Sequence, residues 1–140
     1  MKKLVLVISF LFGIIPYTSS QEKESFTLTV EISGLKSNKG RIITGIYNSQ
    51  IGFLKNQYKS DVVAIKNKKA TIVFKNLNPG EYAVSFIHDA NKNNKMDTNF
   101  FGIPIEDYGC SNNAKGFMGP PKYKDAKFLL TRSKTIQIKI

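Results

Sequence analysis

Short oxygen-bearing side chains recur at alternate positions in the segment HDANKNNKMDTNFFG, residues 88–102, which directly follows an apolar run. Counting from Asp89, an aspartate or asparagine stands at the first, third, fifth and ninth positions, and a lysine stands at the seventh. Calcium loops use side-chain oxygens at these positions and a backbone carbonyl at the seventh, because the hard ion prefers oxygen ligands. The spacing therefore predicts a calcium site formed by Asp89, Asn91, Asn93, Lys95 and Asp97.

Two positions depart from this calcium pattern. Asn94 replaces the glycine of the sharp turn, although asparagine tolerates left-handed backbone better than most residues. Phe100 replaces the glutamate that usually completes the ligand shell, so Glu106 or Asp107 would have to fold back to supply that ligand. We therefore expect weak binding, about 10⁻⁴ to 10⁻³ M, as in extracellular sites. The alternative is a metal-free turn in which the Asn and Asp side chains bond the backbone.

His88 precedes this loop and is the only histidine in the chain. It shares one face of a predicted strand with apolar residues, which favours a packed histidine bonded to a backbone group. A catalytic alternative uses His88, Asp89 and Glu106 as the acid–base set of a hydrolase that acts on envelope polymers. No serine-nucleophile motif or glycine-rich phosphate loop accompanies these residues, so the sequence favours a noncatalytic protein. No cofactor other than calcium is indicated.

Alternating apolar and polar residues predict the strands that position this loop. Their expected ranges are 25–33, 41–48, 62–67, 69–77, 81–88, 126–131 and 135–140. We expect the last two strands to pair with each other, and residues 49–61 to form a short helix or a loop. About seven strands joined by short turns predict an all-β, single antiparallel two-sheet sandwich.

A long segment without a clear strand pattern, residues 90–125, interrupts this alternation. Its length indicates a functional or disordered region, and its many large apolar residues argue against disorder. We therefore expect an irregular lobe over one end of the sandwich. Where its apolar side chains are not buried, they would form a candidate binding surface. These side chains are Phe100, Phe101, Ile103, Ile105, Tyr108, Phe117, Met118 and Tyr123.

The first twenty residues have the layout of a secretory signal peptide, with Lys2 and Lys3 before an apolar run and small residues at 18–20. The run is shorter than the roughly 20 residues that a membrane-spanning helix needs. We expect a signal peptide at 1–20 and one β-sandwich domain at 21–140, without a transmembrane span after cleavage. The mature chain would reside in a periplasm or outside the cell, with a partner there. Cys110 is the only cysteine, so no internal disulfide is possible.

The chain is strongly basic, with a formal net charge of +11, and nearly all of this charge comes from lysine. Arg41 and Arg132 are the only arginines. Nucleic-acid recognition usually relies on arginine, so a nucleic-acid partner is not expected. A weaker preference for polyanions or anionic membrane surfaces is the remaining alternative.

The run from Leu77 to Phe128 resembles the DUF2141 family of small exported bacterial proteins, whose function has not been assigned. The resemblance rests on PGEYAV, HD-x-N-x-N, D-x-N-x-x-G-x-P-x-E and GPP-x-Y-x-D-A. It extends over about residues 26–140, although Asn94 and Cys110 depart from the family pattern. The L-x-P-G-x-Y turn is also similar to prealbumin-like sandwich modules such as carboxypeptidase regulatory domains. These resemblances imply a β-sandwich outside the cytoplasm, hence an exported binding or structural module of the cell envelope.

Overall fold

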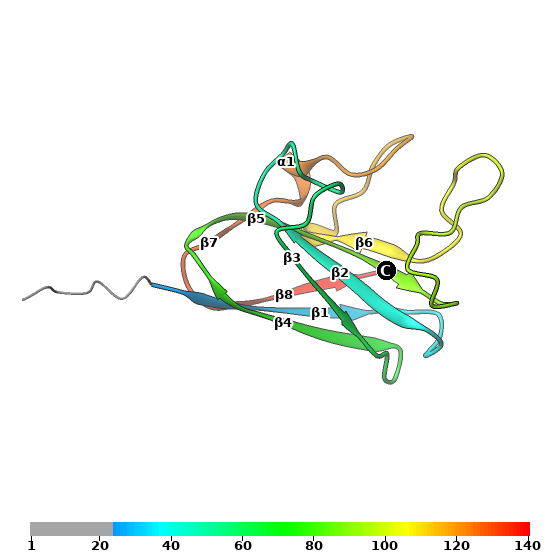
Figure 1. Cartoon of the computed structure of the whole chain (residues 1–140), viewed down its shortest axis with the longest axis horizontal. Coiled ribbons are helices and arrows are strands. Elements are labelled where there is room, and N and C mark those ends of the chain that lie inside the picture. Colours follow the sequence, from blue (N-terminus) through cyan, green and yellow to red (C-terminus); the bar gives the residue numbers. More distant parts are fainter. Residues whose placement is uncertain (1–23) are drawn as a thin grey trace, which may run out of the picture.

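Two β-sheets pack face to face in a computed structural model of the chain, which describes residues 24–140 (Figure 1). The predicted signal peptide at 1–20 lies outside the described residues. No helix in the described part is long and apolar enough to cross a membrane. The predicted all-β two-sheet sandwich is confirmed, with eight strands within residues 24–140 where about seven were expected.

The larger sheet carries the oxygen-rich loop at the end of its central strand. Its main order is β3 (Lys59–Val63), β2 (Arg41–Tyr47), β5 (Gly80–Asp89) and β6 (Tyr108–Cys110). A short further strand, β7 (Phe128–Leu130), pairs with the first three residues of β5, whereas β6 pairs with residues 85–87. Between these two pairings the hydroxyl of Ser111 accepts a hydrogen bond from the Val84 N–H at 2.9 Å. This buried serine therefore bonds β5 where neither short strand pairs with it.

The smaller sheet has the order β4 (Lys69–Leu77), β1 (Phe26–Ser33) and β8 (Lys134–Lys139). β1 runs antiparallel to β4 and parallel to β8, so the sheet is mixed. The predicted pairing of the last two strands with each other is wrong, because β7 joins β5 and β8 joins β1 in the other sheet. Alternation identifies a half-buried strand and its buried face but does not identify the partner that covers its edge. The expected strand at 62–67 is found three residues earlier, as β3 at Lys59–Val63.

The core lies between the two sheets and follows the predicted alternation. β1 buries Leu28, Val30 and Ile32, while Val84 and Phe86 of β5 face them from the larger sheet. Full burial of such a side chain contributes roughly 1.5–3 kcal/mol relative to exposure. The side chains on the opposite face of the larger sheet point away from this core and can contact other segments or a ligand.

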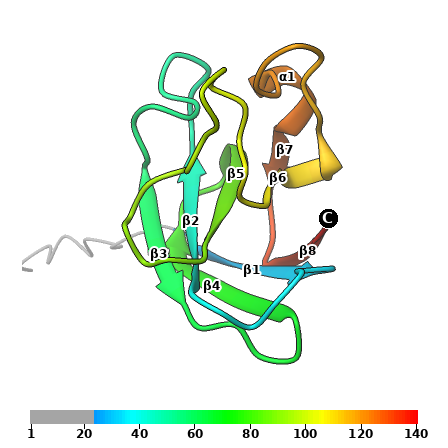
Figure 2. The same ribbon diagram turned by 90° about the vertical axis from the view of Figure 1, so that its right-hand side faces the viewer.

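Three segments stand on that outer face. The cover loop comprises residues 48–58, the first arm residues 90–107 and the second arm residues 114–122. In two views at right angles, all three rise on the side of the larger sheet away from the smaller one (Figures 1 and 2). The predicted single lobe at 90–125 is thus two arms separated by β6 and the one-turn helix η1 (Ser111–Asn113), before helix α1 (Tyr123–Ala126).

Candidate functional site

Asp89 lies at the end of β5, and its carboxylate organises the oxygen-rich loop. Its side chain is fully buried, and Oδ2 accepts hydrogen bonds from Arg41 Nε at 3.0 Å and the Asn94 N–H at 3.1 Å. Its Oδ1 accepts one from the Asn93 N–H at 2.9 Å. Burial alone would raise the pKa of Asp89, but the hydrogen bonds from Asn94, Arg41 and Asn93 outweigh it and lower the pKa. The group is therefore held as a carboxylate.

Arg41, on the neighbouring strand β2, forms hydrogen bonds to several residues of the same loop. Besides Asp89, its guanidinium donates to the Lys92 carbonyl at 3.1 Å and to Asn94 Oδ1 at 2.7 Å. A planar guanidinium can serve three acceptors in fixed directions, which an ammonium group does less well. The residue was not among the predicted site residues. Its one signal in the sequence was that it is one of only two arginines among 21 basic residues.

The remaining predicted calcium ligands gather around Asp97. The side-chain amides of Asn91 and Asn93 donate to its two oxygens at 2.6 and 2.8 Å. The same two asparagines accept from the backbone N–H groups of Asn93 and Lys95, as Asx turns do. The loop thus has the local hydrogen bonding of the metal-free alternative.

Glu106 does fold back to the loop, as predicted for a replacement ligand. Its carboxylate accepts from the backbone N–H groups of Ala90 at 2.9 Å and Asp97 at 3.1 Å, which joins both ends of the segment. No group of three His, Cys, Asp or Glu side chains within residues 24–140 has the arrangement of a metal site. Calcium binding by Asp89, Asn91, Asn93, Lys95, Asp97 and Glu106 stays a prediction.

The structure gives each of the three members of the hydrolase hypothesis its own hydrogen-bond partners. His88 is buried and bonds the Lys39 carbonyl through Nε2 at 2.7 Å, while Nδ1 lies 3.9 Å from Asp107 Oδ2. Asp89, the next residue along the strand, points to the opposite face and bonds Arg41. Glu106 bonds backbone amides. This arrangement fits the packed histidine and gives the acid–base alternative no support.

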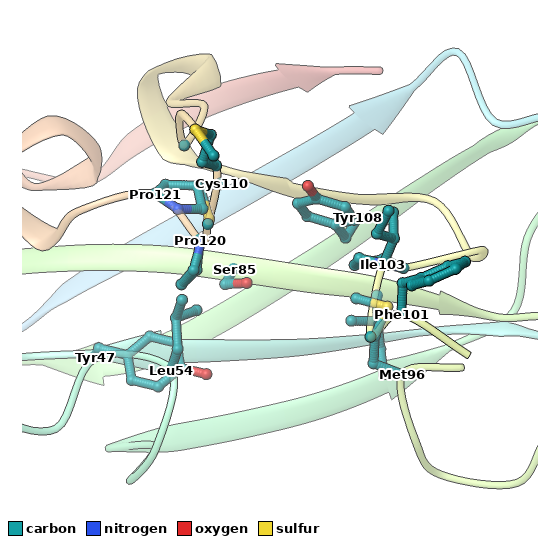
Figure 3. A pocket seen from close by; sticks show the side chains of 16 residues that line it. Tyr47, Leu54, Ser85, Met96, Phe101, Ile103, Tyr108, Cys110, Pro120 and Pro121 are labelled. Atoms are coloured by element: carbon teal, nitrogen blue, oxygen red, sulfur yellow. The ribbon is translucent and has the colours of Figure 1, made fainter. Parts of the chain in front are cut away.

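The outer face of the larger sheet carries a groove with a volume of about 860 Å³ (Figure 3). Its floor comes from three adjacent strands, with Tyr47 on β2, Ser85 and Ile87 on β5, and Tyr108 and Cys110 on β6. These side chains share one face because they alternate with core residues.

The groove has walls from all three outer segments (Figure 3). Leu54 of the cover loop and Pro120 of the second arm lie near one end, whereas Phe101 and Ile103 of the first arm lie near the other. The cover loop packs closely against β2 at Gly45, which has no side chain. A Cβ atom at Gly45 would lie only 2.8 Å from Cγ of Gln57 in the cover loop. The groove is mainly apolar, and its hydroxyl groups come from Ser85 and the two tyrosines.

One end of the sheet's outer face is closed by a second apolar cluster. Phe53 of the cover loop packs edge-on against Tyr47 and Tyr123, with ring centroids 5.3 and 5.6 Å apart. Cys110 belongs to this cluster and is buried, and burial raises the pKa of its thiol although a hydrogen bond from Ser85 opposes the effect. The thiol is therefore a packing group at the groove floor.

Most apolar residues of the predicted lobe are exposed. Tyr123 is buried, but seven others are not: Phe100, Phe101, Ile103, Ile105, Tyr108, Phe117 and Met118. The sequence analysis expected a binding surface wherever these side chains are not buried. It missed the groove floor, because Ser85 and Ile87 lie on a strand whose outer face gave no signal of function.

Comparison with known proteins identifies the family. A family model described as "Uncharacterized protein conserved in bacteria (DUF2141)" matches residues 30–138, most of the chain. Neither the curated proteins nor the solved structures gave a match. The chain therefore belongs to the DUF2141 family.

Proposed function

We propose that this protein is a noncatalytic binding module of the cell envelope, exported by its first twenty residues, which binds an apolar ligand in the groove between its two arms. The single observation behind this proposal is the groove itself. Its volume of about 860 Å³ falls within the range of roughly 300–1,000 Å³ that is typical of small-molecule sites.

The groove chemistry indicates the ligand class. Aliphatic and aromatic side chains form most of its wall, and Ser85, Tyr47 and Tyr108 add hydroxyl groups at the floor. Such a lining favours a mostly apolar molecule with one or two hydrogen-bonding groups. Apolar contact would supply the affinity, and the hydroxyl groups would orient the ligand.

The noncatalytic part of the proposal rests on how the titratable groups are used. His88, Asp89 and Glu106 each bond a different partner, and two of them point to opposite sheet faces. General acid–base catalysis needs groups within hydrogen-bond reach of one substrate. We therefore favour binding over hydrolysis.

The polyanion alternative is also less favoured. Lysines occur on both sheets, for example Lys59 on β3, Lys75 on β4 and Lys134 on β8, as well as on the arms. A polyanion binder would concentrate them on one face, because binding scales with the number of simultaneous phosphate contacts.

We also propose that calcium adds to the order of the first arm. Asp89 Oδ1 accepts a single hydrogen bond, so it keeps an acceptor direction for an ion. Asp97, in the same turn, has a half-buried side chain whose carboxylate could also contact the ion. Arg41 already compensates the charge of Asp89, which is consistent with weak binding.

Binding of N-phenyl-1-naphthylamine, a neutral apolar fluorescent probe, tests the groove. We expect saturable fluorescence enhancement that Ser85→Phe abolishes, because a phenyl ring from the floor would fill the space. Tyr108→Ser should weaken binding about tenfold, since losing apolar ring contact costs about 1.4 kcal/mol or more.

The matched control is Thr71→Phe, which adds the same ring to an exposed position on β4 of the other sheet. It should leave probe binding unchanged, and circular dichroism should report the same fold for each variant. Equal probe binding by the wild type and a folded Ser85→Phe variant would refute the groove as the binding site.

A further inference from the structure

Four large apolar side chains at the ends of the two arms are almost fully exposed. Phe100 and Phe101 on the first arm have 97% and 82% of their surface exposed, and Phe117 and Met118 on the second arm each have 94%. Exposure of this degree in paired large apolar residues is unusual for a surface that meets only water. Phe100 and Phe117 do not line the groove, so its ligand does not account for them.

The two tips lie on one side of the molecule. The first arm leaves the end of β5 and the second arm follows η1, and in views at right angles both rise toward the same side of the larger sheet (Figures 1 and 2). Phe101 and Met118, one from each arm, line the same groove. A flat apolar medium in front of this side could therefore contact both tips together. The phenyl rings of Phe100 and Phe101 pack edge to face with centroids 5.5 Å apart, which forms one compact apolar knob.

Exposed lysines lie on the same three segments as the groove walls. They are Lys55 on the cover loop, Lys92 and Lys95 on the first arm, and Lys115 and Lys122 on the second arm. None of the five forms an ion pair within residues 24–140.

The acidic side chains of the same segments are engaged inside the protein. Asp97 accepts two amide donors, Glu106 accepts two backbone N–H groups, and Asp107 pairs with Lys36 at 2.6 Å. All three are only partly exposed. Hydrogen bonds from neutral donors leave these carboxylates charged, so five lysines against three acids give the cover loop and the two arms together a net charge of +2.

We propose that the two arms dock this protein onto an anionic lipid bilayer, with Phe100, Phe101, Phe117 and Met118 inserted at the interface and lysines of the cover loop and the two arms against the headgroups. Apolar insertion combined with basic attraction is how peripheral proteins hold anionic membranes. Two separate tips suit a fluid surface, because lipids close around each one without a preformed complementary shape. A second copy of the chain fits less well, since the lysines of the two copies would face each other.

This inference goes beyond the proposed groove ligand and does not depend on it. The test uses the chain from Gln21, since the apolar run at 4–15 would bind lipid by itself and every described element lies after it. Co-sedimentation is measured with vesicles of phosphatidylglycerol and phosphatidylethanolamine, and with vesicles of phosphatidylcholine alone. We expect binding to the anionic vesicles that falls about tenfold or more when salt is raised from 0.1 to 0.5 M.

The double variant Phe100→Ser/Phe117→Ser separates insertion from charge attraction. It should lower vesicle binding about tenfold or more because two apolar rings leave the interface. Leu129→Ser, at an exposed apolar residue on β7, should not change it. The double variant should also bind the naphthylamine probe normally, so that failure of this proposal is distinguishable from failure of the groove.

Two further experiments test the contribution of the lysine charges and the depth to which the first arm inserts into the bilayer. Lys115→Glu/Lys122→Glu should weaken binding more than Lys68→Glu/Lys75→Glu, which changes two lysines at or near β4. The chain has no tryptophan, so Phe100→Trp would report insertion through a blue-shifted emission that brominated lipid quenches. Any of three results would overturn the proposal: no binding to anionic vesicles, undiminished binding by the phenylalanine double variant, or a dimer that this variant abolishes.

Discussion

The Asp89–Arg41 pair fixes the point where β5 leaves the sheet. The carboxylate has no exposed surface, yet three donors surround it, one of them a guanidinium that is itself partly exposed. Removing one partner of such a buried pair leaves the other uncompensated, which costs more than the pair itself contributes. The root of the first arm therefore depends on these two side chains.

Acid should weaken this contact. The folded-state pKa of Asp89 lies below its usual value of 3.8, so its contribution to stability is complete above that pH and is lost as pH falls below it. We expect the melting temperature of the wild type to fall more steeply below about pH 4 than that of Asp89→Asn. The two proteins should differ most at neutral pH.

Thermal unfolding followed by circular dichroism between pH 2 and 7 measures this difference. Asp125→Asn changes an exposed carboxylate on α1 and should keep the wild-type pH dependence. If Asp89→Asn matched the wild type at every pH, the buried pair would contribute nothing.

At the scale of elements, the loop after β5 is where the sequence prediction was most specific. Short Asn and Asp side chains at alternate positions indicated a turn around polar groups, and the loop is such a turn. The same pattern serves a metal-free Asx network and a calcium loop, because both place side-chain oxygens on the inside of a coil. Position and residue type alone do not distinguish them.

Calcium should stabilise the protein if the loop binds it. At ten times its dissociation constant an ion adds about 1.4 kcal/mol, so 10 mM calcium should raise the melting temperature by several degrees. Asp97→Asn should abolish the shift. Asp97 is the better position for this test than Asp89, because replacing Asp89 would also remove a hydrogen-bond acceptor of Arg41. Magnesium at the same concentration is the control, and an unchanged melting temperature in calcium would remove the ion from this account.

Strand prediction succeeded where one face is buried. β1, β2, β4 and β5 lie within about one residue of their expected ranges, because alternation reports directly on a half-buried strand. β6 was missed, since three residues are too few to show a period of two. β6 forms because its backbone pairs with the edge of β5. This pairing is a tertiary contact, so the local sequence pattern does not report it.

At the scale of the whole molecule, the sandwich could be predicted and the groove could not. About seven strands in some 120 residues leave few alternatives to two packed sheets. The groove joins side chains from the cover loop, β5, β6 and both arms, which are far apart in sequence. The apolar composition of 90–125 indicated a binding surface, but only the positions of the arms on the outer sheet face define its shape.

The central claim is that the outer face of the larger sheet binds an apolar ligand. Amide chemical shifts of ¹⁵N-labelled protein, titrated with N-phenyl-1-naphthylamine, test it at residue resolution. The account predicts saturable shifts concentrated at Ser85, Ile87, Tyr108 and the two arms, with β1 and β4 unchanged. Shifts spread evenly over both sheets, or confined to residues outside the groove, would contradict it.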